Sequence, residues 1–219
     1  MGSVIVITSG KGGTGKTSLT GGVGASLALL GKQVLCLDGD VGLRNLDITL
    51  GMTDAALMDF SDVMAGRCDL SRAAVPHPTV SGLHLLTAPL TLPGDFPGEA
   101  GFQALLQQAR EAYDYVLIDS PAGLGPGFRL AVCGADRAIV VAVSDPSSLR
   151  DAQRVVTQLS QLETIHLVVN RVRPRLLRRQ NTTIDDAMDT AGLPLLGLVP
   201  EDPKVVLAAT EGRPLAQLG

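Results

Sequence analysis

The sequence predicts an α/β fold, a mostly parallel, doubly wound sheet of about seven or eight strands with helices on both faces. Short apolar runs alternate with longer helical stretches along the 219 residues, which is the pattern of right-handed βαβ crossovers. Hydrophobic residues make up 45% of the chain but aromatic ones only 3%, so aliphatic side chains must fill the core, as in a sheet buried on both faces. This composition excludes a disordered chain and favours one globular domain over residues 1–219.

The expected strands are apolar runs bounded by turn signals. In chain order they are Val4–Thr8, Val34–Leu37, Leu83–Thr87, Tyr115–Ile118, Ala138–Val143, Ile165–Val169 and Leu193–Val199. The stretches between them that are long enough for helices are Gly15–Leu30, Ala55–Met64, Gly98–Ala112, Ser147–Leu162, Thr183–Ala191 and Lys204–Thr210. The piece Pro89–Gly98 is rich in Pro and Gly, and we interpret it as a loop within the domain rather than a linker.

The helix expected at 183–191 has clear signals at both ends. Thr182 or Thr183 can cap its N terminus, and Asp185 and Asp186 place negative charge in its first turn, where the helix dipole favours it. Gly192 then closes the helix.

Charge and cysteine content exclude several classes of function and site. The net charge of −4 argues against a surface that holds nucleic acid everywhere by charge. Cys36, Cys68 and Cys133 are scattered without CxxC spacing, which predicts neither a disulfide framework nor a zinc site and fits a reducing cytoplasm. The run Val4–Ile7 is too short for a signal sequence, so we expect a core strand in a protein that is not exported.

A phosphate-binding loop directly follows the first expected strand. Small residues let main-chain N–H groups surround phosphate oxygens, and the N terminus of the next helix, which contains Ser18, adds positive potential. Lys16 would contact the β- and γ-phosphates of ATP or ADP, and Thr17 would ligate Mg²⁺. The pattern G-x-x-x-x-G-K-[ST] is matched in full by Gly10, Lys11, Gly12, Gly13, Thr14, Gly15, Lys16 and Thr17.

Acidic residues follow two of the expected strands. Asp38 and Asp40 come after Val34–Leu37, and Asp119 ends the apolar run Tyr115–Ile118 in the Walker B pattern, where it would support Mg²⁺ through water. The carboxyl ends of parallel strands meet at the edge where ligands bind in open α/β sheets. Asp38 or Asp40 could there hold Mg²⁺ or orient the water that attacks the γ-phosphate.

These segments resemble one known family. The string KGGTGKT is similar to the deviant Walker A motif of the MinD/ParA/nitrogenase iron protein superfamily, and residues 38–47 and the string DSPAG at 119–123 resemble the two switch segments of its MinD branch. The resemblance, which runs from residue 4 to about 215, implies a Mg²⁺-dependent ATPase. It implies that Lys11 reaches the phosphates of the partner in an ATP-bound homodimer, beside Lys16 of the same loop. It also implies that Asp40 positions the attacking water, and that Asn45 and Gly123 belong to switches I and II.

The same resemblance implies a site for the nucleotide base. Asn170 and Arg171 end the expected strand Ile165–Val169, where the family places an Asn that hydrogen-bonds the base, and Pro200 begins the loop that closes over it. Asn and Pro at strand ends are equally the residues of ordinary turns, and the residues alone leave that alternative open.

A basic segment follows the same strand and consists of Arg171, Arg173, Arg175, Arg178 and Arg179. Its charge suits phosphate, acidic lipid or an acidic protein, and equally a solvated loop face. The string NRVRP resembles the MinD branch at this place, so the segment does not by itself favour DNA, and nucleic acid is not an expected partner.

The implied function is an ATP-dependent switch in placing the division septum, with MinC- and MinE-like regulators as partners in the cytoplasm. The family's C-terminal helix and membrane-targeting stretch find no match here, so we expect attachment to the inner face of the cell membrane only with such a tail. A ParA-like ATPase that segregates DNA or cargo is the main alternative. Electron transfer, as in the nitrogenase iron protein, is disfavoured because no cysteine lies in Pro89–Gly98 or just after Asp119.

Overall fold

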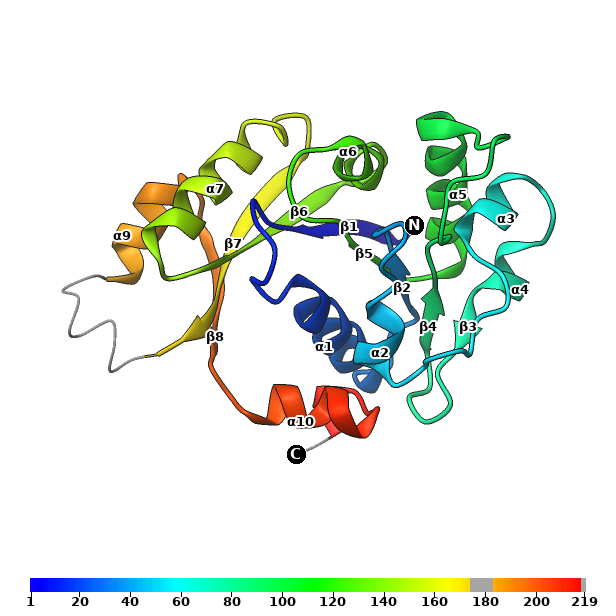
Figure 1. Cartoon of the computed structure of the whole chain (residues 1–219), viewed down its shortest axis with the longest axis horizontal. Helices are drawn as coiled ribbons and strands as arrows, with labels where there is room; N and C mark the ends of the chain where they lie inside the picture. The colour runs from blue at the N-terminus through cyan, green and yellow to red at the C-terminus, as the bar shows by residue number, and fades with distance from the viewer. Residues whose placement is uncertain (174–182, 218–219) are drawn as a thin grey trace.

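One sheet runs through the molecule. In the computed structural model, which describes residues 1–173 and 183–217, eight strands pair in the order β3-β4-β2-β5-β1-β6-β7-β8 (Figure 1). They are β1 (Ser3–Thr8), β2 (Val34–Asp38), β3 (Val75–Pro76), β4 (Leu83–Leu86), β5 (Tyr115–Asp119), β6 (Arg137–Val143), β7 (Thr164–Val172) and β8 (Leu195–Pro200). Each neighbouring pair is parallel except β3 and β4. The predicted mostly parallel sheet is confirmed.

The seven predicted strands are all present, and β3 is an additional antiparallel strand of two residues at the edge. Two residues show no hydrophobic period, and Pro76 is typical of an edge strand because it has no N–H to donate. The last strand begins at Leu195, two residues later than predicted, and Leu193 lies in the segment that leads into it. Pro194 contributes only its carbonyl oxygen, which accepts the Leu167 N–H.

Helices cover both faces of the sheet. One face carries α1 (Lys16–Leu29), α2 (Leu46–Leu50) and α10 (Lys204–Glu211), and the other carries α5 (Gly98–Ala112), α6 (Pro126–Val132), α7 (Pro146–Val156) and α9 (Ile184–Ala191) (Figure 1). Successive residues of the central strands point to opposite faces. Ile7 therefore joins the core under α1, whereas Val6 packs in the core that contains Phe102 of α5.

Some helix predictions need correction. The helix predicted at Ala55–Met64 is shorter, because α3 (Phe60–Met64) begins only after Asp59. Asp59 accepts the Ser61 N–H at 2.8 Å and the Asp62 carboxylate accepts the Asp59 N–H at 3.0 Å, a capping box that fixes the start. The helix predicted to reach Leu162 ends at Val156. Helices α2, α4 (Leu70–Ala73) and α6 were not predicted, because they are too short to show a helical period.

The ends of α9 are those the sequence predicted. Thr183 accepts the Asp186 N–H at 3.1 Å, and the Asp186 carboxylate accepts the Thr183 N–H at 2.7 Å. Gly192 closes the helix in the left-handed conformation. Thr182, the other predicted cap, lies outside the described residues.

The strand register brings the predicted site residues to one edge. Asp119 of β5 lies beside Ile7 of β1 and beside Asp38 of β2. The loops that follow these three strands therefore leave the sheet side by side.

Candidate functional site

The loop between β1 and α1 forms the floor of the site (Figure 1). Gly13 and Gly15 have φ angles of 77° and 91°, in the left-handed region that favours glycine. A Cβ atom added at Gly12 or Gly13 would meet no atom of the described chain within 4 Å, so this side of the loop is open. Gly15 is the N-cap residue of α1 and has no side chain to cap the helix, which leaves its first N–H groups for an anion.

Lys16, the first residue of α1, is 8% exposed. Burial lowers the pKa of its ammonium group, while the charges of Asp119 and Asp40 act in the opposite direction. Beside it, the Thr14 hydroxyl is buried without a hydrogen-bond partner in the described chain. Buried polar groups normally have partners, so the unpaired hydroxyl fits a loop shaped for a ligand.

Two buried carboxylates lie across from each other in the register of β2 and β5. Asp38 is 1% exposed and Asp119 is 3% exposed. Burial raises the pKa of Asp119 to about 7, and the Asp38 charge adds to this, while the Thr17 hydroxyl and Lys16 act against it. Thr17, Asp38 and Asp119 thus form an all-oxygen donor set, which suits Mg²⁺. Residues 1–173 and 183–217 contain no group of three His, Cys, Asp or Glu side chains that could hold a metal.

The segment 38–47, which is predicted to be switch I, begins at the end of β2. The pKa of the half-buried Asp40 is raised by burial and held back by Lys16, so the side chain lies near the phosphate lysine. Asn45 is exposed and stands at the N-cap of α2 without a side-chain capping bond. Between them, Arg44 takes a positive φ of 45° and donates to the Thr87 hydroxyl at 2.7 Å.

The segment 119–123, which is predicted to be switch II, begins at the end of β5 and contacts the loop between β1 and α1 at Ser9. Gly123 has a φ of 84°, and its N–H donates to the Ser9 carbonyl oxygen over a long 3.4 Å. The structure therefore brings Gly123 to this loop, and its place in switch II remains a prediction.

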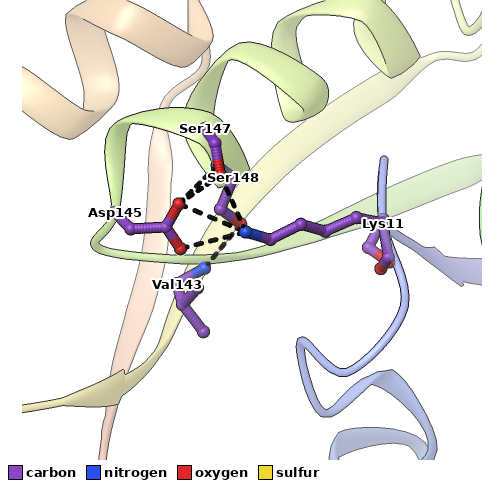
Figure 2. A network of polar contacts seen from close by, with 6 residues as sticks. Lys11, Val143, Asp145, Ser147 and Ser148 are labelled. Atoms are coloured by element: carbon purple, nitrogen blue, oxygen red, sulfur yellow. Dashed lines mark hydrogen bonds and ion pairs between the residues drawn. The ribbon is translucent and has the colours of Figure 1, made fainter.

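Lys11 is engaged within its own chain. Its Nζ atom lies 3.2 and 3.1 Å from the two carboxylate oxygens of Asp145 and 3.0 Å from the Ser147 hydroxyl (Figure 2). Burial disfavours the charged form of Asp145, but bonds from Ser147, the Ser148 N–H and Lys11 outweigh it and hold the pKa below its usual value. The predicted contact of Lys11 with a partner's phosphates therefore requires this lysine to leave Asp145.

The predicted base residues line one cavity of about 830 Å³. Gly15 and Ser18 of the phosphate end, Asn170 and Arg171 of β7, and Pro200 of β8 all contribute to its wall. Further along, the cavity is lined by apolar residues of α1 and α10, among them Val23, Leu27 and Val206. The structure thus brings the five predicted residues together beside the phosphate loop.

Asn170 is 8% exposed and its amide is already engaged. Its Nδ2 donates to the Thr14 carbonyl oxygen at 2.8 Å, and its Oδ1 accepts the Arg171 N–H at 2.9 Å. One amide hydrogen and one lone pair are left over in this arrangement. Asn170 therefore ties the phosphate loop to β7, a contact that its position in the sequence does not reveal.

Only part of the basic segment is described. Arg171 borders the cavity, and Arg173 forms a bidentate ion pair with Glu201. Arg175, Arg178 and Arg179 lie outside the described residues. Among the described helices, none has the length and apolarity needed to cross a bilayer.

Sequence reasoning missed Asp145 as a partner of Lys11. A signal was present, because Asp145 stands between the strand end at Val143 and Pro146, where an acidic residue caps a helix and lies at the ligand edge. Its side chain indeed accepts the Ser148 N–H at 2.9 Å.

Comparison with known proteins places these features in a family. The sequence profile described as CobQ/CobB/MinD/ParA nucleotide binding domain matches residues 5–215. The septum site-determining protein MinD of Synechocystis sp. is 40% identical over 218 residues, which cover 98% of this chain and 82% of that protein.

Solved structures agree. The MinC:MinD cell division protein complex of Aquifex aeolicus matches with a TM-score of 0.89 and 38% identity over 97% of this chain and 87% of that one. MinD of Pyrococcus horikoshii complexed with Mg-ADP matches with a TM-score of 0.84 and 30% identity over 99% of this chain and 88% of that one. With the glycine loop, the buried acids and Lys11 in these positions, the chain belongs to the CobQ/CobB/MinD/ParA nucleotide-binding family, in its branch of MinD septum site-determining proteins.

Proposed function

We propose that this protein is a Mg²⁺-dependent ATPase that dimerises with ATP bound and acts as a switch in placing the division septum. The observation that carries the proposal is the buried Lys16 at the start of α1, whose pKa is influenced by the charges of Asp119 and Asp40, next to a glycine loop that is open at Gly12 and Gly13. The relative from Pyrococcus horikoshii binds Mg-ADP, which supports the same ligands here.

Each residue of the site has a role that follows from its place. The loop N–H groups and Lys16 would hold the phosphates, and Thr17 and Asp119 would supply oxygen atoms near Mg²⁺, with Asp38 beside Asp119 in the sheet register. When bound, Mg²⁺ neutralises charge on the phosphate oxygens. The Lys16 charge acts on the pKa of Asp40, which supports a role for Asp40 in orienting water at the γ-phosphate. Asn170, Arg171 and Pro200 frame the base cavity.

Dimerisation rests on Lys11. A lysine on an open loop can exchange one anionic partner for another, and the phosphates of a second protomer carry more negative charge than Asp145. Switches I and II leave the same edge of the sheet as this loop, so ATP can order them and the dimer face together.

The Aquifex aeolicus relative forms a complex with MinC, which supports a MinC-like partner for this protein. A MinE-like regulator and attachment to the inner membrane face complete the proposal by family analogy. A ParA-like ATPase that segregates DNA or cargo is the alternative, and DNA binding in the presence of ATP distinguishes the two.

The test is sedimentation of the protein with Mg²⁺ and either ATP or ADP, together with phosphate release and a mobility-shift assay on nonspecific DNA. We expect a dimer with ATP, a monomer with ADP, hydrolysis that stops when Mg²⁺ is chelated, and no salt-sensitive DNA binding. A protein that stays monomeric and does not hydrolyse ATP would refute the proposal, and ATP-dependent DNA retention would favour segregation.

A further inference from the structure

Asp38 makes contacts that its expected role as a metal ligand does not explain. Its Oδ1 accepts the Asp40 N–H at 2.9 Å, and its Oδ2 accepts the Leu46 N–H at 3.1 Å. The carboxylate is buried at the end of β2, where these two main-chain N–H groups replace water as its hydrogen-bond partners. Hydrogen bonds to a charged acceptor are the stronger kind, and here two of them come from one short segment.

The two donors stand at the two ends of switch I. Asp40 opens the segment and Leu46 is the first residue of α2, so one side chain holds both ends of the loop 40–46. Asn45, the N-cap residue of α2, makes no side-chain capping bond. Asp38 takes the place of that cap, and its negative charge suits a helix N terminus.

The middle of this loop is held from outside, because Arg44 donates to the Thr87 hydroxyl at 2.7 Å and the Gly42 N–H donates to the Pro89 carbonyl oxygen at 3.2 Å. Gly42 and Arg44 have positive φ angles of 93° and 45°, and a non-glycine residue rarely adopts this conformation. The Leu43 and Arg44 N–H groups donate to the Asp40 carbonyl oxygen over 3.2 and 3.4 Å, both long for such bonds. The two bonds to Asp38 hold the beginning and the end of the loop, where these other contacts do not reach.

We infer that Asp38 is a positioning residue for ATP hydrolysis, which holds Asp40 and the start of α2 in place, and that it contributes little to direct binding of Mg²⁺. This inference rests on the proposed ATPase function. Asp38 acts through Asp40, whose main chain it fixes next to the residue that would orient water. Asp119 and Thr17, whose side chains are hydrogen-bonded to each other, remain the residues that would hold Mg²⁺.

The test compares Asp38→Asn with Asp119→Asn in the full chain. Asparagine has the shape of aspartate, but its NH₂ group would face one of the two N–H donors of switch I and break that bond. We expect Asp38→Asn to keep ADP and Mg²⁺ affinity within about threefold and to lower kcat by about 10- to 100-fold with KM unchanged. Amide exchange in residues 40–46 should rise about tenfold while that of the phosphate loop stays constant. Asp119→Asn should instead weaken Mg²⁺ binding.

A loss of Mg²⁺ affinity in Asp38→Asn without faster exchange at 40–46 would overturn the inference in favour of a metal ligand, and so would unchanged exchange with unchanged kcat. If the variant does not fold, the wild-type protein decides the matter. The Asp40 and Leu46 amides should be protected from exchange before and after Mg²⁺ and ADP are added, and their rapid exchange would overturn the inference. A wild-type protein without ATPase activity would refute the proposed function, whereas the exchange data would still test the two bonds to Asp38.

Discussion

The phosphate end and the base end of this site are built in different ways. At the phosphate end, main-chain N–H groups and buried charges come from β1, β2 and β5, neighbours at the centre of the sheet. At the base end, side chains of β7 and β8 border a cavity whose far wall is apolar. The phosphate end is fixed by the main chain and the core, so single substitutions there should abolish nucleotide binding or hydrolysis. The base end is shaped by side chains bonded to one another, so single substitutions there should lower nucleotide affinity only in part.

The largest effect should come from the lysine at the centre of the phosphate end. Lys16→Ala removes the buried cation between Asp119 and Asp40 and leaves two acids facing the phosphates. We expect ATP and ADP affinity to fall by at least about 100-fold, because charge-assisted hydrogen bonds are lost and repulsion is added. Calorimetry measures this, and unchanged affinity would disprove the phosphate-loop assignment.

Asp40→Ala should separate hydrolysis from binding within the same end. Lys16, Thr17 and Asp119 remain, so Mg²⁺-ATP binding should persist, while hydrolysis slows by about 10²- to 10⁴-fold because a water-orienting group is lost. The ATP-bound dimer should accumulate. Affinity, dimer fraction and phosphate release are measured on one preparation, and normal hydrolysis or lost Mg²⁺-ATP binding would each contradict the role given to Asp40.

The difference between the two ends also governs what could be predicted from sequence. The phosphate loop and the acids at strand ends are local patterns, so Lys16, Asp38 and Asp119 were found where the structure places them. The contact of Lys11 with Asp145 joins residues 134 positions apart, and that of Asn170 with Thr14 joins residues 156 apart. Such pairs depend on how the sheet is assembled, and no short motif records them.

Substitution of Lys11 tests whether this residue of the phosphate loop is needed for dimerisation. Lys11→Ala should retain nucleotide binding, because its Nζ contacts Asp145 rather than the nucleotide cradle, yet lose ATP-dependent dimerisation. Sedimentation with ATP measures both states, and an undisturbed dimer would remove the role.

Asp145→Asn is the matched control for Lys11. It keeps a side-chain oxygen for the Ser148 N–H but removes the charge that holds the lysine. Both partners of this ion pair are about a third or more exposed, so its loss should tighten the ATP dimer only about two- to fivefold. The gain should vanish when Lys11 is also alanine, since no lysine is then released.

The base end gives the most informative test, because Asn170 belongs to both ends. Asn170→Ala removes its bond to the Thr14 carbonyl oxygen and its free amide groups in the cavity. If the loss of each function costs about 0.7 kcal/mol, ATP affinity should fall about tenfold and that of inorganic tripolyphosphate, which has no base, only about threefold. The loss shared by both ligands reports the tie to the phosphate loop, and the excess for ATP reports contact with the base. Equal losses would mean that Asn170 acts only on the loop, and an unchanged tripolyphosphate affinity would mean that the tie has no effect on binding. Either result would show that Asn170 does not link the binding of the phosphates to the binding of the base.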